Sequence, residues 1–203
     1  MTDTANTTAA ATAALPDPRP AFAGALALAG RTLAAVHPDR LDDPTPCADY
    51  TVRDLSDHLV AILRRVAAIG RGEDPLGLPD RATDIATGTW AAAWDEAVRE
   101  VEGAWSDPAV LGRQYRLPFG TLPGALALVA YSTEFTLHTW DLATATGQDP
   151  AWDPHVLAPS LAAMHRALPA EPRGRPVPFA AVVDTAPDAP DIDRLVAWYG
   201  RRP

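Results

Sequence analysis

A glutamate and a histidine four residues apart are the residues of this sequence best suited to metal chemistry. Glu134 and His138 stand in the run YSTEFTLHTWDLATATG, and Asp141 follows three residues later. If the run is helical, the three side chains project within about 60° of one another. Helical bundles build metal sites from such pairs on facing helices. An exposed Glu–His pair is the alternative interpretation.

A histidine on a second predicted helix favours the metal interpretation. His58 lies at the edge of an apolar stripe and so faces the inside of the bundle. A lone histidine there is more often a packed core residue, but His58, Glu134 and His138 together match a catalytic zinc site with one open position. Iron, nickel and manganese accept the same ligand types.

Two aspartates are expected to orient these histidines. Metal-bound histidines usually donate their other ring proton to an acceptor such as a carboxylate. Asp141, one turn from His138, and Asp54, one turn from His58, are placed for this role. The alternative for Asp141 is a bond to an arginine or to a backbone amide.

The elements that must position these residues are helices. Thr51 followed by Asp54 resembles a capping box, and the stripe that follows it ends at Gly70. The run 114–118 is expected to be extended, and 177–183 could be a strand although it has no obvious partner. The pattern predicts helices over about 20–36, 51–70, 84–105, 122–146, 154–168 and 191–199.

Four long amphipathic helices joined by short connections predict an all-α fold, a four-helix bundle with short extra helices at its C-terminal end. Residues 1–18 are rich in Thr, Ala, Asn and Pro with a single leucine, so we expect a disordered tail. Residues 19–203 are then expected to form one metal-binding domain.

Composition excludes some classes of function. A net charge of −9 and a pI near 4.9 argue against nucleic-acid binding. The two neighbouring arginines Arg201 and Arg202 are expected to form a solvated basic tail. One cysteine, Cys47, forms no intrachain disulfide and favours a reducing compartment. With neither a signal peptide nor a membrane-spanning stretch in the sequence, we expect a cytoplasmic protein.

Three stretches carry a resemblance to a known family. TPCADYTVRDLSDHLV and TEFTLHTWDLATATGQDP resemble the two signatures of the mycothiol-dependent maleylpyruvate isomerase family, within the DinB-like superfamily. DRLVAWYGRRP is similar to the C-terminal segment of an actinobacterial, mostly uncharacterised metal-binding branch. The resemblance implies a DinB-like four-helix bundle, a divalent metal held by His58, Glu134 and His138, and use of the thiol mycothiol.

The chain departs from the family pattern in two places. Tyr50 stands where tryptophan is common, and both side chains can pack at a helix N-terminus. Only about 50 residues follow the fourth helix, which argues against maleylpyruvate as the substrate. Cys47 is expected to be a small packed residue, the alternative being a thiol activated by a helix N-terminus.

We therefore expect an enzyme, a monomer or homodimer, that uses zinc and mycothiol for thiol transfer or isomerisation of a small electrophile. Hydrolysis by a metal-activated water is the chemical alternative. A non-catalytic metal- or small-molecule-binding protein, with Asp141 or His155 closing the coordination sphere, is a second possibility. A tailoring enzyme of secondary metabolism on the same bundle is a third.

Overall fold

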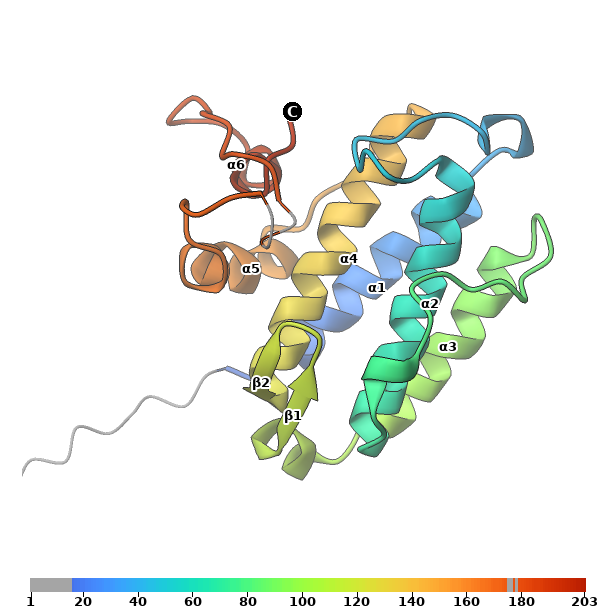
Figure 1. Ribbon diagram of the computed structural model, residues 1–203, viewed down its shortest axis with the longest axis vertical. Coiled ribbons are helices and arrows are strands. Elements are labelled where there is room, and N and C mark those ends of the chain that lie inside the picture. Colours follow the sequence, from blue (N-terminus) through green and yellow to red (C-terminus); the bar gives the residue numbers. More distant parts are fainter. Residues whose placement is uncertain (1–15, 175–176, 178) are drawn as a thin grey trace, which may run out of the picture.

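The chain is mainly helical, which confirms the predicted all-α class. Figure 1 shows the computed structural model, in which residues 16–174, 177 and 179–203 are described. With η for a 3₁₀ helix, the elements are α1 Arg19–Ala34, η1 Pro38–Arg40, α2 Val52–Arg71, η2 Pro75–Gly77, α3 Trp90–Ala104, η3 Pro108–Gly112, β1 Gln114–Leu117, β2 Gly120–Pro123, α4 Gly124–Thr146, α5 Pro154–Ala167 and α6 Asp191–Trp198.

Helices α1 to α4 form the predicted four-helix bundle (Figure 1). The α2 helix packs against α3 and α4, and α1 packs against α4 and α3. Phe135 of α4 is fully buried at the centre, where its ring meets Phe22 at 6.0 Å and Trp94 at 5.6 Å between centroids. Burial of such large apolar side chains is the main term that stabilises the bundle.

The helix that carries His58 begins at a capping box, as predicted. The Thr51 hydroxyl accepts from the backbone N–H of Asp54, and the Asp54 carboxylate accepts from the backbone N–H of Thr51. The helix ends at Gly72, whose φ of +82° is left-handed, two residues later than predicted. His58 therefore lies two turns inside a well-defined helix.

The helix that carries Glu134 and His138 follows a β-hairpin. The predicted extended run is strand β1, and it pairs antiparallel with β2, which the sequence reading missed. Because Leu122 belongs to β2, α4 begins two residues later than predicted. A side chain at Gly124 would collide with the carbonyl oxygen of Val110, so this tight entry requires glycine.

Two other predicted elements need correction. Helix α3 begins at Trp90 and not near residue 84, because the chain turns through Gly88 at a φ of +86°. The possible strand over 177–183 is also wrong where the structure describes it: Val177 forms only an isolated bridge to Gly174, and 179–183 are not in a strand. Position 178 lies outside the described residues.

The extra C-terminal helices form a second layer against the bundle. Figure 1 shows α5 and α6 beside α4, on the side away from α2 and α3. They enclose a smaller apolar cluster that shares Leu137 of α4 and includes Leu157, Met164, Leu195 and Tyr199. This layer fixes the chain end against the C-terminal half of α4, where Arg201 bonds Asp141.

The expected tail over 1–18 is described only in part. Residues 1–15 lie outside the described residues, so their disorder stays a prediction. Pro18 is buried and its carbonyl accepts from the N–H of Phe22, while Asp17 pairs with Arg19. Residues 17 and 18 of the expected tail therefore make contacts with the start of α1. In the described part of the chain, no helix combines the length and the apolar content needed to cross a membrane.

Candidate metal centre

The three predicted ligands meet between α2 and α4. Nε2 of His58 lies 3.5 Å from Oε1 of Glu134, and Nε2 of His138 lies 3.3 Å from the same oxygen. One ligand atom from each of the three residues falls within 4.8 Å of the other two. The side chains thus converge on one point although 76 residues (58 to 134) separate the two helical motifs.

These separations fit a shared metal ion better than direct hydrogen bonds. An N–H···O hydrogen bond has a typical length of about 2.9 Å. Two atoms that bind one tetrahedral ion at about 2.0–2.1 Å stand about 3.3 Å apart. The separations of 3.5 and 3.3 Å match the second figure. Two imidazoles and a carboxylate also form a donor set suited to zinc.

The His58 ring is oriented by a backbone carbonyl. Its Nδ1 lies 2.6 Å from the carbonyl oxygen of Asp80, so Nδ1 carries the proton and the lone pair of Nε2 points at Glu134. Tyr50 stacks on the ring at 5.0 Å between centroids. The prediction that Asp54 orients His58 is wrong, because the Asp54 carboxylate caps α2 and pairs with Arg81.

The His138 ring is oriented by Asp141, where the sequence predicted this carboxylate to lie. Its Nδ1 lies 3.1 Å from Oδ2 of Asp141, which is fully buried. Arg201 holds the same carboxylate with two bonds, Nε to Oδ1 at 3.2 Å and Nη2 to Oδ2 at 2.9 Å. Arg201 is therefore not part of a solvated tail, and its side chain is only 11% exposed.

The electrostatics of the site favour a cation at its centre. Burial would raise the pKa of Glu134, but His138 and His58 outweigh burial and hold that pKa well below its usual value. Burial would lower the pKa of His138, but Glu134 and Asp141 raise it to about 9. The carboxylates therefore stay ionised near neutral pH and attract either a proton or a metal ion.

The site has one accessible side. The Glu134 side chain is 32% exposed, whereas the side chains of His58 and His138 are 9% and 8% exposed. Glu134 thus lies at the mouth and the imidazoles lie deeper. Three protein ligands, one of them partly exposed, are fewer than the four of a closed structural zinc site and match the number in catalytic sites.

The neighbouring cysteine and the spare histidine do not close this side. Among the described residues, the Cys47 sulfur groups with His138 and Asp141 and not with His58 and Glu134. In the metal-free protein burial, followed by the charge of Asp141, raises the pKa of its thiol to about 11. His155 is exposed at the start of α5 and is not among the ligand groups found in the described residues. Asp141 is already held by Arg201 and His138.

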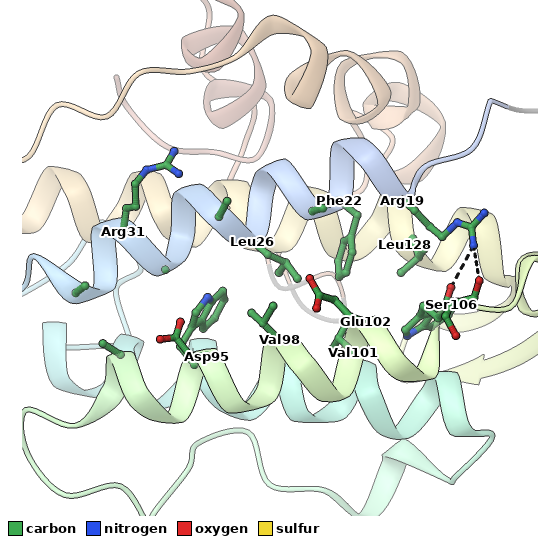
Figure 2. Close-up of a pocket in the computed structure, with 17 residues that line it drawn as sticks. Arg19, Phe22, Leu26, Arg31, Asp95, Val98, Val101, Glu102, Ser106 and Leu128 are labelled. Carbon is green, nitrogen blue, oxygen red and sulfur yellow. Dashed lines mark hydrogen bonds between the residues drawn. The ribbon is translucent and has the colours of Figure 1, made fainter.

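A separate groove lies on another side of the bundle. Figure 2 shows Phe22 and Leu26 of α1 and Val98 of α3 pointing into the space between their helices. This groove measures about 560 Å³ and has Arg31, Asp95 and Glu102 among its lining residues. It lies between α1 and α3, whereas the three candidate ligands come from α2 and α4, so it is distinct from the metal centre.

Two orienting groups were missed from the sequence. The Asp80 carbonyl belongs to the loop after η2, and a backbone acceptor leaves no signature in residue type. Arg201 lies 60 residues after Asp141, so no helical spacing links the two residues. The similarity of the C-terminal segment to a metal-binding branch was the one available sign that Arg201 has a buried role.

Two curated proteins are similar to this chain over most of its length. The chain is 34% identical over 170 residues to two uncharacterized proteins of Mycobacterium tuberculosis, MT0763 of strain CDC 1551 / Oshkosh and Rv0738 of strain ATCC 25618 / H37Rv. Each match covers 83% of this chain and 89% of the relative.

Solved structures share the fold at low sequence identity. The crystal structure of the mycothiol-dependent maleylpyruvate isomerase matches with a TM-score of 0.59 at 15% identity, over 74% of this chain and 70% of that one. The crystal structure of a mutant of such an isomerase matches with a TM-score of 0.57 at 14% identity, over the same shares of the two chains. Residues 22–143 match the family described as the mycothiol maleylpyruvate isomerase N-terminal domain. The chain belongs to this family.

Proposed function

We propose that this protein is a divalent-metal-dependent enzyme in which mycothiol acts on a small electrophilic substrate, by thiol transfer or isomerisation. The observation that carries the proposal is the pair of histidines whose Nε2 atoms face Glu134 Oε1 while their Nδ1 atoms are held by Asp80 and Asp141. Both rings therefore direct Nε2, the nitrogen available to a metal ion, to one point. Open sites with such ligands are typical of catalytic metal centres.

Each residue has a distinct proposed role. His58, Glu134 and His138 hold the metal, for which zinc is the expected ion. The Asp80 carbonyl and Asp141 fix the two rings, and Tyr50 covers one face of His58. When bound, the metal acts as a Lewis acid that favours the deprotonated form of a thiol or of water. The exposed side of Glu134 is where an incoming molecule enters.

A thiol cofactor is favoured over a thiol of the protein. The thiol of Cys47 stays protonated near neutral pH because burial raises its pKa to about 11. In the metal-free protein this disfavours Cys47 as the nucleophile and favours a sulfur from outside the chain, for which a structural neighbour named as mycothiol-dependent supplies the candidate. The single cysteine also favours a reducing compartment, so we place the protein in the cytoplasm.

Metal content tests the ligand assignment. Protein purified without a histidine tag should carry close to one divalent ion per chain, measured by elemental analysis. His58→Ala and His138→Ala should each lose most of it, and Glu134→Gln should lose less because the amide keeps an oxygen donor. His155→Ala is the control, since that side chain is exposed. Unchanged metal in both ligand histidine variants would refute the site.

Cobalt substitution tests the thiol. Titration of the cobalt form with mycothiol should produce a thiolate-to-cobalt charge-transfer band, and an oxygen analogue of mycothiol should not. A screen of small electrophiles with and without mycothiol then identifies the reaction. Absence of the band at saturating thiol, together with hydrolysis of an ester or amide without thiol, would instead support metal-activated water.

A further inference from the structure

The buried pair of Arg201 and Asp141 connects the C-terminal layer to the metal centre. Asp141 is fully buried on α4, and Arg201 reaches it from beyond the end of α6. The two side chains form two bonds, and the oxygen that receives the 2.9 Å bond is also the one that faces Nδ1 of His138 at 3.1 Å. A two-bond arginine–carboxylate pair fixes the plane of the carboxylate as well as its charge.

The position of Arg201 depends on how α6 ends and docks. Gly200 has a φ of +84°, and a side chain there would approach Ala180 to 2.8 Å, so the turn after α6 requires glycine. Its geometry lets the N–H of Arg201 bond to the carbonyl of Val196 at 3.0 Å. Leu195, fully buried in the C-terminal cluster, anchors the same helix. Arg201 can therefore hold Asp141 only while α6 is in place.

We propose that Arg201 is a positioning residue through which docking of α6 sets the metal affinity of the site. This inference rests on the proposed metal centre. With Arg201 present, the carboxylate plane of Asp141 is fixed, so the His138 ring is held with Nε2 facing Glu134. Without Arg201, Asp141 can rotate about its own side chain, and the ring loses that orientation. Groups that orient metal ligands typically contribute 10- to 100-fold in affinity.

The coupling has a reciprocal consequence. If docked α6 strengthens metal binding, then bound metal must favour docked α6 by the same factor. Metal binding should therefore slow hydrogen exchange at amides of α6, although α6 supplies none of the proposed ligands. A purely structural role for Arg201 would stabilise α6 equally with and without metal.

The test compares Arg201→Ala with Arg202→Ala, its exposed neighbour. Metal affinity is measured by competition with a chelator, and α6 exchange is measured with and without zinc. We expect Arg201→Ala to bind metal 10- to 100-fold more weakly and to lose the metal-dependent protection of α6. Arg202→Ala should match the wild type. Arg201→Lys, which keeps the charge without the two-bond geometry, should fall between them.

Asp141→Asn supplies the second arm if Arg201→Ala folds poorly, because it removes the charge that would be left buried and unpaired. In that background, replacing Arg201 with alanine should weaken metal binding no further. Wild-type affinity in Arg201→Ala, or unchanged α6 exchange on metal binding by the wild type, would overturn the inference and leave the metal centre intact. Failure of the wild type itself to bind metal would instead overturn the proposed function.

Discussion

At the scale of single residues, the metal centre places a proton and a metal ion in competition. His138 is buried beside two carboxylates, and their charges outweigh the cost of burying an imidazolium. In the metal-free protein its pKa is raised to about 9. A metal ion that binds Nε2 must therefore displace a proton at neutral pH.

This competition predicts the pH dependence of metal affinity. Below the raised pKa of about 9, each pH unit downward leaves about tenfold less deprotonated His138, so affinity should fall by about that factor. Binding at pH 8.5 should be roughly 100-fold tighter than at pH 6.5. The metal affinity at each pH is measured by competition with a chelator, with a correction for protonation of the chelator. A pH-independent affinity over this range would show that His138 carries no such proton.

The Cys47 thiol is predicted to react slowly with alkylating reagents near neutral pH. Burial, and then the charge of Asp141, disfavour the thiolate and raise its pKa to about 11. Near neutral pH the folded, metal-free protein should react with iodoacetamide roughly 100-fold more slowly than the same protein in denaturant. Equal rates would mean an activated thiol. Cys47→Ser should keep the metal content of the wild type.

At the scale of elements, local signals predicted most of the helices that carry the site. The capping box of α2 lies within a few residues of sequence, so its start could be read directly. The beginning of α3 could not be read from the sequence. Ile85 continues the apolar pattern of that helix, but it packs against the core from a non-helical segment. The hairpin before α4 was missed in part, because β2 is short and half exposed.

The capping box gives a prediction for α2. Thr51→Ala removes the hydroxyl that accepts from the Asp54 N–H, so the free energy of unfolding should fall by ~1 kcal/mol. Denaturant unfolding of the metal-free protein measures it. Thr89→Ala is a matched control, because Thr89 occupies the N-cap of α3 and its exposed hydroxyl donates to the Ala86 carbonyl without capping the helix. That variant should change the unfolding free energy by less than about 0.5 kcal/mol. Equal changes in the two variants would mean that the hydrogen bond of the Thr51 cap does not contribute to the free energy of unfolding.

At the scale of the whole molecule, the bundle could be predicted and the contacts between its layers could not. Four long helical stretches with apolar residues at helical spacing predict a four-helix bundle with little reference to distant residues, although the segments that join them, 35–51, 72–89 and 105–123, are long. The bond between Arg201 and Asp141 depends on where the second layer docks, which no local periodicity encodes. Arginine beside arginine at a polar chain end resembled a solvated tail, and only the packing of α6 separates their roles.

The N-terminal boundary is a prediction at this scale. From their composition we expect residues 1–15 to be dispensable, so their deletion should leave the melting temperature unchanged. Deletion through Arg19 should lower it, because Arg19 donates to the Ser106 carbonyl and buried Pro18 caps α1. Thermal melts of both forms decide it. A large drop on removing only 1–15 would show that this segment packs on the bundle.

The bond from Arg201 to Asp141 also has a consequence for how the protein is made. The ribosome synthesises the chain from the N-terminus to the C-terminus, so His58, Glu134 and His138 are made before Arg201. During that interval Asp141 has His138 beside it but lacks Arg201, which holds it with two bonds in the finished protein. Burying this carboxylate before Arg201 can pair with it is less favourable, which disfavours closing this part of the bundle early. The metal centre should therefore reach its final form only as residues 191–201 emerge and dock.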